Sequence, residues 1–182
     1  MIRLPIASLI GACATGLLVV ASSAHAQSAP AAPDEIRLHG QDQAFITDAT
    51  RSASTQHEAA RLATSRSTDR EVKAFAERVG ADNARLSEAL RAASPRGVDV
   101  PDNDPDVAVL DSIKDLRGGD FDKAYIEQVA LGDEQKTLSI FQAEIASGRN
   151  GQLKEAARQA LPTVQADYAQ ARELARRKHL AE

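Results

Sequence analysis

The chain has 182 residues, a formal net charge of −4, one Cys, one Met and no Trp. The acidic balance argues against nucleic-acid binding, because negative surface charge repels phosphate groups. A single Cys, Cys13, excludes an intramolecular disulfide and a cluster held by several thiolates. The length is enough for one domain with a sizeable core.

The first 26 residues have the pattern of a cleavable secretory signal peptide. Arg3 supplies a positive charge, residues 4–20 are apolar and small, and Ala24 and Ala26 form an A-x-A cleavage site. The apolar run is shorter than the ~20 residues of a permanent membrane span. We therefore expect export to the periplasm, possible association with the outer membrane, and a mature chain without an integral membrane span. A lipid anchor on Cys13 is the alternative.

The residues that follow divide into a tether, a helical domain and a short tail. Residues 27–41 are small, polar and contain Pro, which is typical of a flexible tether. From residue 42 to residue 178 apolar side chains recur at helical spacing, and no segment alternates as a strand does. Residues 179–182 form the tail. The signals for helix starts and stops predict helices at about 43–66, from a Thr68–Glu71 capping box to Pro95, after Pro105, from an Asp120 cap to about 146, and from an Asn150 cap onward.

The lengths of the connections predict how these helices pack. Short loops join the first long helix to the second and the third to the fourth, so each pair is expected to be an antiparallel hairpin. Residues 93–119 hold three Pro and one short helix, and this stretch is long enough to travel the length of a bundle. Two hairpins joined by such a crossover indicate an all-α, ferritin-like four-helix bundle.

Several segments resemble one bacterial envelope family. They are EVKAFA at residues 71–76, DFDKAY at 120–125 and LPT at 161–163. In this order they resemble the domain of unknown function 4142 family, whose members are called predicted outer membrane proteins. The resemblance implies a ferritin-like fold with polar residues facing the bundle interior. Where typical members carry interior histidines this chain has other residues, namely Asn83, Glu134 and Asp167.

Five polar residues lie on or near the predicted inner faces and form a candidate inward cluster. A di-iron carboxylate site needs Glu-x-x-His motifs, and the chain has none. We therefore predict no catalytic residue, no metal-ligand set and no cofactor. A hydrogen-bonded polar layer is the first interpretation, and an oxygen-rich site for Ca²⁺, Mg²⁺, Mn²⁺ or a small ligand is the alternative. The cluster consists of Gln56, Asn83, Asp133, Glu134 and Asp167.

These observations indicate an exported envelope protein without enzymatic activity, which acts through its surface on another envelope protein or on a second copy of itself. A binding module that holds a metal ion or small ligand in the polar cluster is the second hypothesis. An envelope hydrolase is the third. The basic residues 172–179 have two interpretations: contact with an anionic lipid or wall polymer, or favourable charge at a helix C-terminus.

Overall fold

A computed structural model of the chain describes residues 38–102 and 104–180, which belong to one compact unit. These residues form helices and loops, with no strand among them. The predicted signal peptide with Ala24 and Ala26, and most of the predicted tether, lie outside the described residues. The helices are α1 (Gly40–Arg66), α2 (Arg70–Ala93), α3 (Val107–Ile113), α4 (Gly118–Ala124), the π-helix η1 (Tyr125–Asp133), α5 (Glu134–Ser147) and α6 (Gly151–Arg177).

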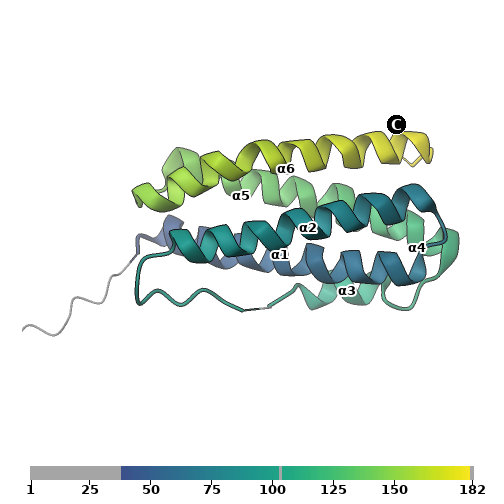
Figure 1. Cartoon of the computed structure of the whole chain (residues 1–182), viewed down its shortest axis with the longest axis horizontal. Helices are drawn as coiled ribbons and strands as arrows, with labels where there is room; N and C mark the ends of the chain where they lie inside the picture. The colour runs from purple at the N-terminus through teal and green to yellow at the C-terminus, as the bar shows by residue number, and fades with distance from the viewer. Residues whose placement is uncertain (1–37, 103, 181–182) are drawn as a thin grey trace, which may run out of the picture. The chain divides into compact units, whose positions relative to one another are not determined.

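Two antiparallel hairpins make the bundle, as the loop lengths predict (Figure 1). The first pairs α1 with α2. The second pairs α6 with one long rod in which α4, η1 and α5 follow without a break. The crossover between the hairpins runs along the bundle beside α1 and carries α3. Arg51 of α1 binds Asp104 at 3.0 Å, and Thr55 Oγ1 accepts the backbone N–H of Asp106, so the crossover is fastened to α1. The all-α fold of two hairpins joined by a crossover is confirmed.

In the first hairpin, the two predicted helix starts are wrong in detail. Asp69, and not Thr68, caps α2: its carboxylate accepts the backbone N–H groups of Glu71 and Val72. Because an aspartate satisfies both donors, the reciprocal capping box is not needed. At the start of α1, His39 Nδ1 accepts the N–H of Gln41. The helix therefore begins at Gly40, inside the segment predicted as tether.

The second hairpin has one wrong and two correct boundaries. The rod begins at Gly118, whose φ of 54° lies in the left-handed region that favours glycine. Asp120, the predicted cap, lies in the first turn and does not cap the helix. Asn150 caps α6 as predicted, because its side-chain oxygen accepts the N–H groups of Gln152 and Leu153. The helix end predicted at about residue 146 is also correct, because α5 ends at Ser147 with Gly148 as its C-cap.

The apolar faces predicted for the long helices are buried, and they form two clusters at different heights in the bundle. One cluster contains Phe75, Phe121 and Tyr125; in the other, Phe45 and Phe141 pack edge to face with ring centroids 5.1 Å apart. Each such buried aromatic stabilises the fold by about 1.5–3 kcal/mol. Every long helix also contributes buried polar residues at the level between the two clusters. These are Ser52, Gln56, Asn83, Asp133, Glu134, Thr137 and Asp167, which we call the polar layer.

The basic residues at the C-terminal end of α6 form ion pairs within the bundle. Lys178 Nζ binds the carboxylates of Asp69 and Glu71, and Arg177 Nε binds Glu71 at 2.9 Å. These pairs join the C-terminal end of α6 to the first turn of α2. They therefore support the second interpretation of the basic residues, in which their charge acts at the C-terminus of the helix. Across residues 38–102 and 104–180, no helix is long and apolar enough to cross a membrane.

Candidate functional site

The polar layer centres on two adjacent acids, Asp133 and Glu134, which are both buried, with 5% and 2% of their surface exposed. Adjacent residues of a regular helix point about 100° apart. Here the pair stands at the junction where the π-helix η1 gives way to α5. Nine π-helical residues change the register of the rod, and π-helical turns are often found at functional sites. At this junction Asp133 meets α1, whereas Glu134 meets α2 and α6.

Asp133 is held by hydrogen bonds from α1. Gln56 Nε2 donates to Asp133 Oδ2 over 3.2 Å, and Ser52 Oγ donates to the same oxygen over 3.4 Å. Ser52 Oγ also lies within hydrogen-bond distance of Thr137 Oγ1, which in turn lies 2.9 Å from the backbone carbonyl oxygen of Asp133, so two hydroxyl protons are shared among three contacts. Burial raises the pKa of Asp133 above its ordinary value. The α1 side of the layer is therefore a hydrogen-bond network centred on Asp133, in which Gln56 Oε1 has no partner among the described residues.

Glu134, like Gln56, has a side-chain oxygen without a hydrogen-bond partner in the part of the chain that the structure describes. Oε1 is buried and has no hydrogen-bond partner among the described residues. Burial raises the pKa of Glu134 to about 8, and the negative charges of Asp167 and Asp133 add to the effect. A buried polar atom without a partner costs free energy. Such an atom is a candidate for contact with something that the chain itself does not supply.

Asp167 of α6 faces the same side as Glu134. Arg78 of α2 donates to Asp167 Oδ1 over 3.3 Å. Even so, burial and the nearby charge of Asp82 raise the pKa of Asp167 to about 6. Arg78 also lies over the Phe75 ring, 5.4 Å from its centroid, so packing as well as charge holds the guanidinium in place.

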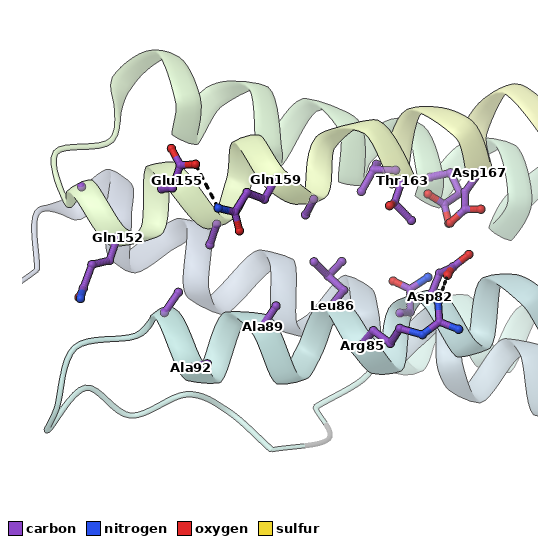
Figure 2. A pocket seen from close by; sticks show the side chains of 17 residues that line it. Asp82, Arg85, Leu86, Ala89, Ala92, Gln152, Glu155, Gln159, Thr163 and Asp167 are labelled. Carbon is purple, nitrogen blue, oxygen red and sulfur yellow. Dashed lines mark hydrogen bonds and ion pairs between the residues drawn. The ribbon is translucent and has the colours of Figure 1, made fainter.

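A groove of about 700 Å³ runs between α2 and α6 and ends at these acids (Figure 2). In Figure 2 the side chains of Leu86, Ala89 and Ala92 on α2 face Gln159 and Thr163 on α6. At one end, Asp82, Asn83, Glu134 and Asp167 line the groove. Residues 151–167 of α6 extend about 24 Å at 1.5 Å per residue, so the groove is elongated.

Small apolar side chains make this groove. Alanines stand where the facing helices approach, and alanine leaves space that a larger residue would fill. The walls are mostly apolar away from the acidic end, with Glu155 and Gln159 hydrogen-bonded to each other at the rim. A concave, mainly apolar site with a few convergent polar groups is typical of small-molecule binding. The apolar lining consists of Leu86, Ala89, Ala92, Ala93, Ala156, Ala160 and Val164.

The structure divides the cluster predicted from sequence into two parts. Gln56 and Asp133 meet in the hydrogen-bond network on the α1 side. Asn83, Glu134 and Asp167 line the acidic end of the groove, although the Asn83 amide donates back to the Val79 carbonyl of its own helix. Nowhere in the described parts of the chain do three or more His, Cys, Asp or Glu side chains gather in a way that could hold a metal ion.

Sequence reasoning missed several residues of the site. Ser52 and Thr137 lie one helical turn from Gln56 and Asp133, so helical spacing could have found them. Arg78 could not be found in this way, because its partner Asp167 lies on another helix, 89 residues away. The groove was also missed, since the pattern of alanines in a helix does not tell whether the facing helix closes over them.

Residues 26–174 match the domain of unknown function DUF4142. The chain belongs to this family. The resemblance carried by residues 71–76, 120–125 and 161–163 is thereby confirmed. The family description assigns no activity.

Among solved structures, the chain is similar to one described as "putative secreted protein DUF305 from Streptomyces coelicolor". The TM-score is 0.63 at 16% sequence identity, and the match covers 78% of this chain and 94% of that chain. At this identity the likeness shows a shared fold and nothing about the site. A search of curated proteins found no match.

Proposed function

We propose that this member of the family is an exported, non-enzymatic binding protein of the bacterial envelope, in the periplasm or at the outer membrane. Its groove between α2 and α6 holds a small amphipathic ligand. The signal-peptide pattern of residues 1–26 supports export. The observation that carries the binding role is the groove itself, about 700 Å³ and lined by apolar side chains up to its acidic end.

The volume fits this role. Sites for small molecules are clefts of roughly 300–1,000 Å³ with apolar walls and a few polar groups that fix orientation. Without a ligand, the apolar walls of this groove face water, which is unfavourable. An apolar ligand body would cover the walls, and the acidic end would orient the ligand. This supports the second hypothesis drawn from the sequence in its small-ligand form.

Action through the outer surface on an envelope partner, or on a second copy, is the competing proposal. Large apolar side chains that are exposed mark interfaces when they gather into a patch. Among the described residues Val107 is the one large apolar side chain that is strongly exposed, at 63%. A single valine makes a small contact. The groove is therefore the stronger candidate for a binding surface.

A tryptophan placed in the groove tests the proposal. In Ala89→Trp the indole would fill the space between α2 and α6, and in Ala84→Trp the same residue would stand on the exposed side of α2. Because the natural chain has no Trp, each variant also carries its own fluorescence probe. The wild type and Ala84→Trp should bind the apolar dye Nile red with equal affinity, and Ala89→Trp should lose this binding.

Native mass spectrometry of the protein purified from the envelope gives a second measurement. A bound small molecule should be present in the wild type and in Ala84→Trp and absent from Ala89→Trp. Equal dye binding by both Trp variants, with no bound molecule in the wild type, would contradict a ligand-binding groove. Crosslinking in the envelope would then be the next experiment, to find a partner of the outer surface.

A further inference from the structure

The acidic end of the groove has one more carboxylate than cations to pair with it. On α2, Arg85 binds Asp82 at 2.6 Å. Between helices, Arg78 binds Asp167 at 3.3 Å. In each of these two pairs the positive charge of the arginine neutralises the negative charge of the aspartate. Glu134 lines the same end of the groove and forms no ion pair within the described parts of the chain.

The unpartnered Oε1 of Glu134 can accept a hydrogen bond from a donor on a ligand. Oε1 has no partner among residues 38–102 and 104–180, and the residue is 98% buried, with 2% of its surface exposed. In its ionised form this carboxylate is an acceptor only, so its complement carries N–H or O–H donors. A positively charged donor forms the stronger hydrogen bond. An anionic group would meet Asp82, Glu134 and Asp167 together and would be repelled.

The rest of the groove defines the other end of the ligand. Beyond the acids the lining is apolar for most of its length, with Leu86, Ala160 and Val164 along the walls. An elongated apolar chain fits such a channel, since it covers these side chains and keeps its charge at one end. Size, wall chemistry and the unmatched carboxylate therefore all point to one kind of molecule.

Resting on the proposed function, we propose that the groove selects single-chain cationic amphiphiles, with an ammonium or guanidinium head at Glu134 and an apolar chain along α2 and α6. The head donates to Glu134 Oε1 and balances its charge. Asp82 and Asp167, each already paired with an arginine, add a negative field without needing the ligand. The class of ligand is thus set by the one acid that has no cation.

Binding of such a head is coupled to a proton. Glu134 faces Arg78 and Asp82 from α2 and Asp167 from α6, with Asp133 and Tyr125 on its own rod. Burial holds its pKa near 8, so below that pH the carboxyl is neutral and must lose its proton when a cation binds. Affinity for an amine should therefore rise with pH, by up to about tenfold per unit below pH 8.

Three probes with one chain and different heads test the proposal: n-decylamine, n-decanol and decanoate, titrated by calorimetry at pH 8. The wild type should bind the amine at least about tenfold more tightly than the alcohol, since a charged hydrogen bond replaces a neutral one. Decanoate should bind most weakly. Glu134→Gln should lose most of the preference for the amine, with its affinity for the alcohol unchanged.

Glu155→Gln is the matched control, because it removes a carboxylate from the opposite end of the same groove. It should keep the preference for the amine. If the preference is lost in Glu155→Gln and kept in Glu134→Gln, the head lies at the wrong end and the proposal is wrong. Circular dichroism verifies that both variants fold. Should Glu134→Gln not fold, the wild type alone is decisive, with amine affinity rising from pH 6 to pH 8 and alcohol affinity constant.

The outcomes separate the two proposals. Binding of all three probes with similar affinity would overturn the cationic head and leave the binding groove standing. Binding of none of them, together with no effect of Ala89→Trp on Nile red, would overturn the groove as a ligand site. Displacement of the amine by Mg²⁺, Ca²⁺ or Mn²⁺ alone, dependent on Glu134, would mean that the acidic end takes a metal ion instead.

Discussion

Gly80 of α2 lies directly against Ala60 of α1: a Cβ atom on residue 80 would stand 2.9 Å from the Ala60 Cβ. Real Cβ atoms essentially never approach so closely. The contact lies within the first hairpin, where α1 and α2 are the most closely associated pair of helices in the bundle. Glycine in a helix normally weakens it by roughly 0.5–1 kcal/mol relative to alanine. Here the missing Cβ is what allows the two helices to meet.

Gly80→Ala should therefore destabilise the protein, although alanine is the better helix former. We expect overpacking to cost about 1–3 kcal/mol, which exceeds the gain in helix propensity. Gly119→Ala is the control, because no atom lies within 4 Å of its Cβ position. That variant should be as stable as the wild type or more so. Urea unfolding measures both, and a stabilised Gly80→Ala would show that α1 and α2 can move apart without cost.

The network around Asp133 should depend on Gln56. In Gln56→Leu the buried carboxylate loses the donor that lies 3.2 Å away. Leaving a buried acceptor with fewer partners costs about 1–3 kcal/mol, so the free energy of unfolding should fall by that amount. Gln165→Leu, on the exposed side of α6, should change it by less than about 0.5 kcal/mol. Equal stability of the two variants would mean that the hydrogen bond from Ser52 is enough by itself to stabilise the buried carboxylate of Asp133.

A second pair of acids predicts a pH dependence of stability. Glu144 is fully buried near Asp42, whose carboxylate accepts the backbone N–H groups of Arg149 and Asn150. Burial opposes ionisation of Asp42, yet these two hydrogen bonds hold its pKa below the ordinary value. Burial and the neighbouring Asp42 raise the pKa of Glu144 from 4.5 to about 7. The pKa values of Asp42 and Glu144 are thus shifted in opposite directions.

The direction in which stability changes with pH follows from the number of protons bound in the folded and unfolded states. Between pH 4.5 and pH 7 the unfolded chain has released the Glu144 proton and the folded chain still holds it, so stability falls as pH rises. Glu144→Gln resembles the protonated acid and should remove this loss. We expect the variant to match the wild type at pH 4.5 and to be more stable by up to about 3 kcal/mol at pH 8.

Thermal unfolding from pH 4.5 to pH 8 measures this difference. Subtracting the variant from the wild type isolates Glu144, because the other buried acids titrate in both proteins. Glu88→Gln, on the exposed face of α2, should show no such pH-dependent difference. A difference between wild type and Glu144→Gln that stays constant with pH would contradict the argument.

The start of α2 should respond to Asp69 and not to the residues that the sequence pattern singled out. Asp69 caps the helix and also binds Lys178. Asp69→Ala should cost about 1–2 kcal/mol, whereas Thr68→Ala and Asp120→Ala should each cost less than about 0.5 kcal/mol. Guanidinium unfolding is unsuitable here because it screens charge, so urea is preferred.

A double-mutant cycle separates the two roles of Asp69. Lys178→Met combined with Asp69→Ala should show a coupling of about 0.5–1 kcal/mol, which shrinks at 1 M NaCl. The remainder of the Asp69→Ala effect is the cap and should be insensitive to salt. A coupling near zero would mean that Lys178 is held by Glu71 alone.

Helical spacing was enough to predict which faces of the long helices are buried, because a helix that packs on one side shows this in its period of 3.6 residues. The same spacing placed Gln56, Asn83 and Glu134 near the interior. It failed at helix starts, where two neighbouring polar residues compete as caps and geometry selects between them, as with Thr68 and Asp69. It also had no means to predict the π-helix over Tyr125–Asp133, which ends where the two adjacent buried acids lie.

The sequence by itself determined the all-α class, the two hairpins and the apolar and polar layers of each helix, since these depend on local spacing and loop length. It also indicated the family, through the resemblance of short segments such as residues 71–76 and 120–125. Only the tertiary structure decided that the polar residues divide into a hydrogen-bond network around Asp133 and an acidic end of the groove. It also decided that α2 and α6 leave a groove. Both depend on contacts between residues far apart in the chain, such as Arg78 with Asp167 and Gln56 with Asp133, and the strength of such contacts is set by the distance and orientation of whole helices.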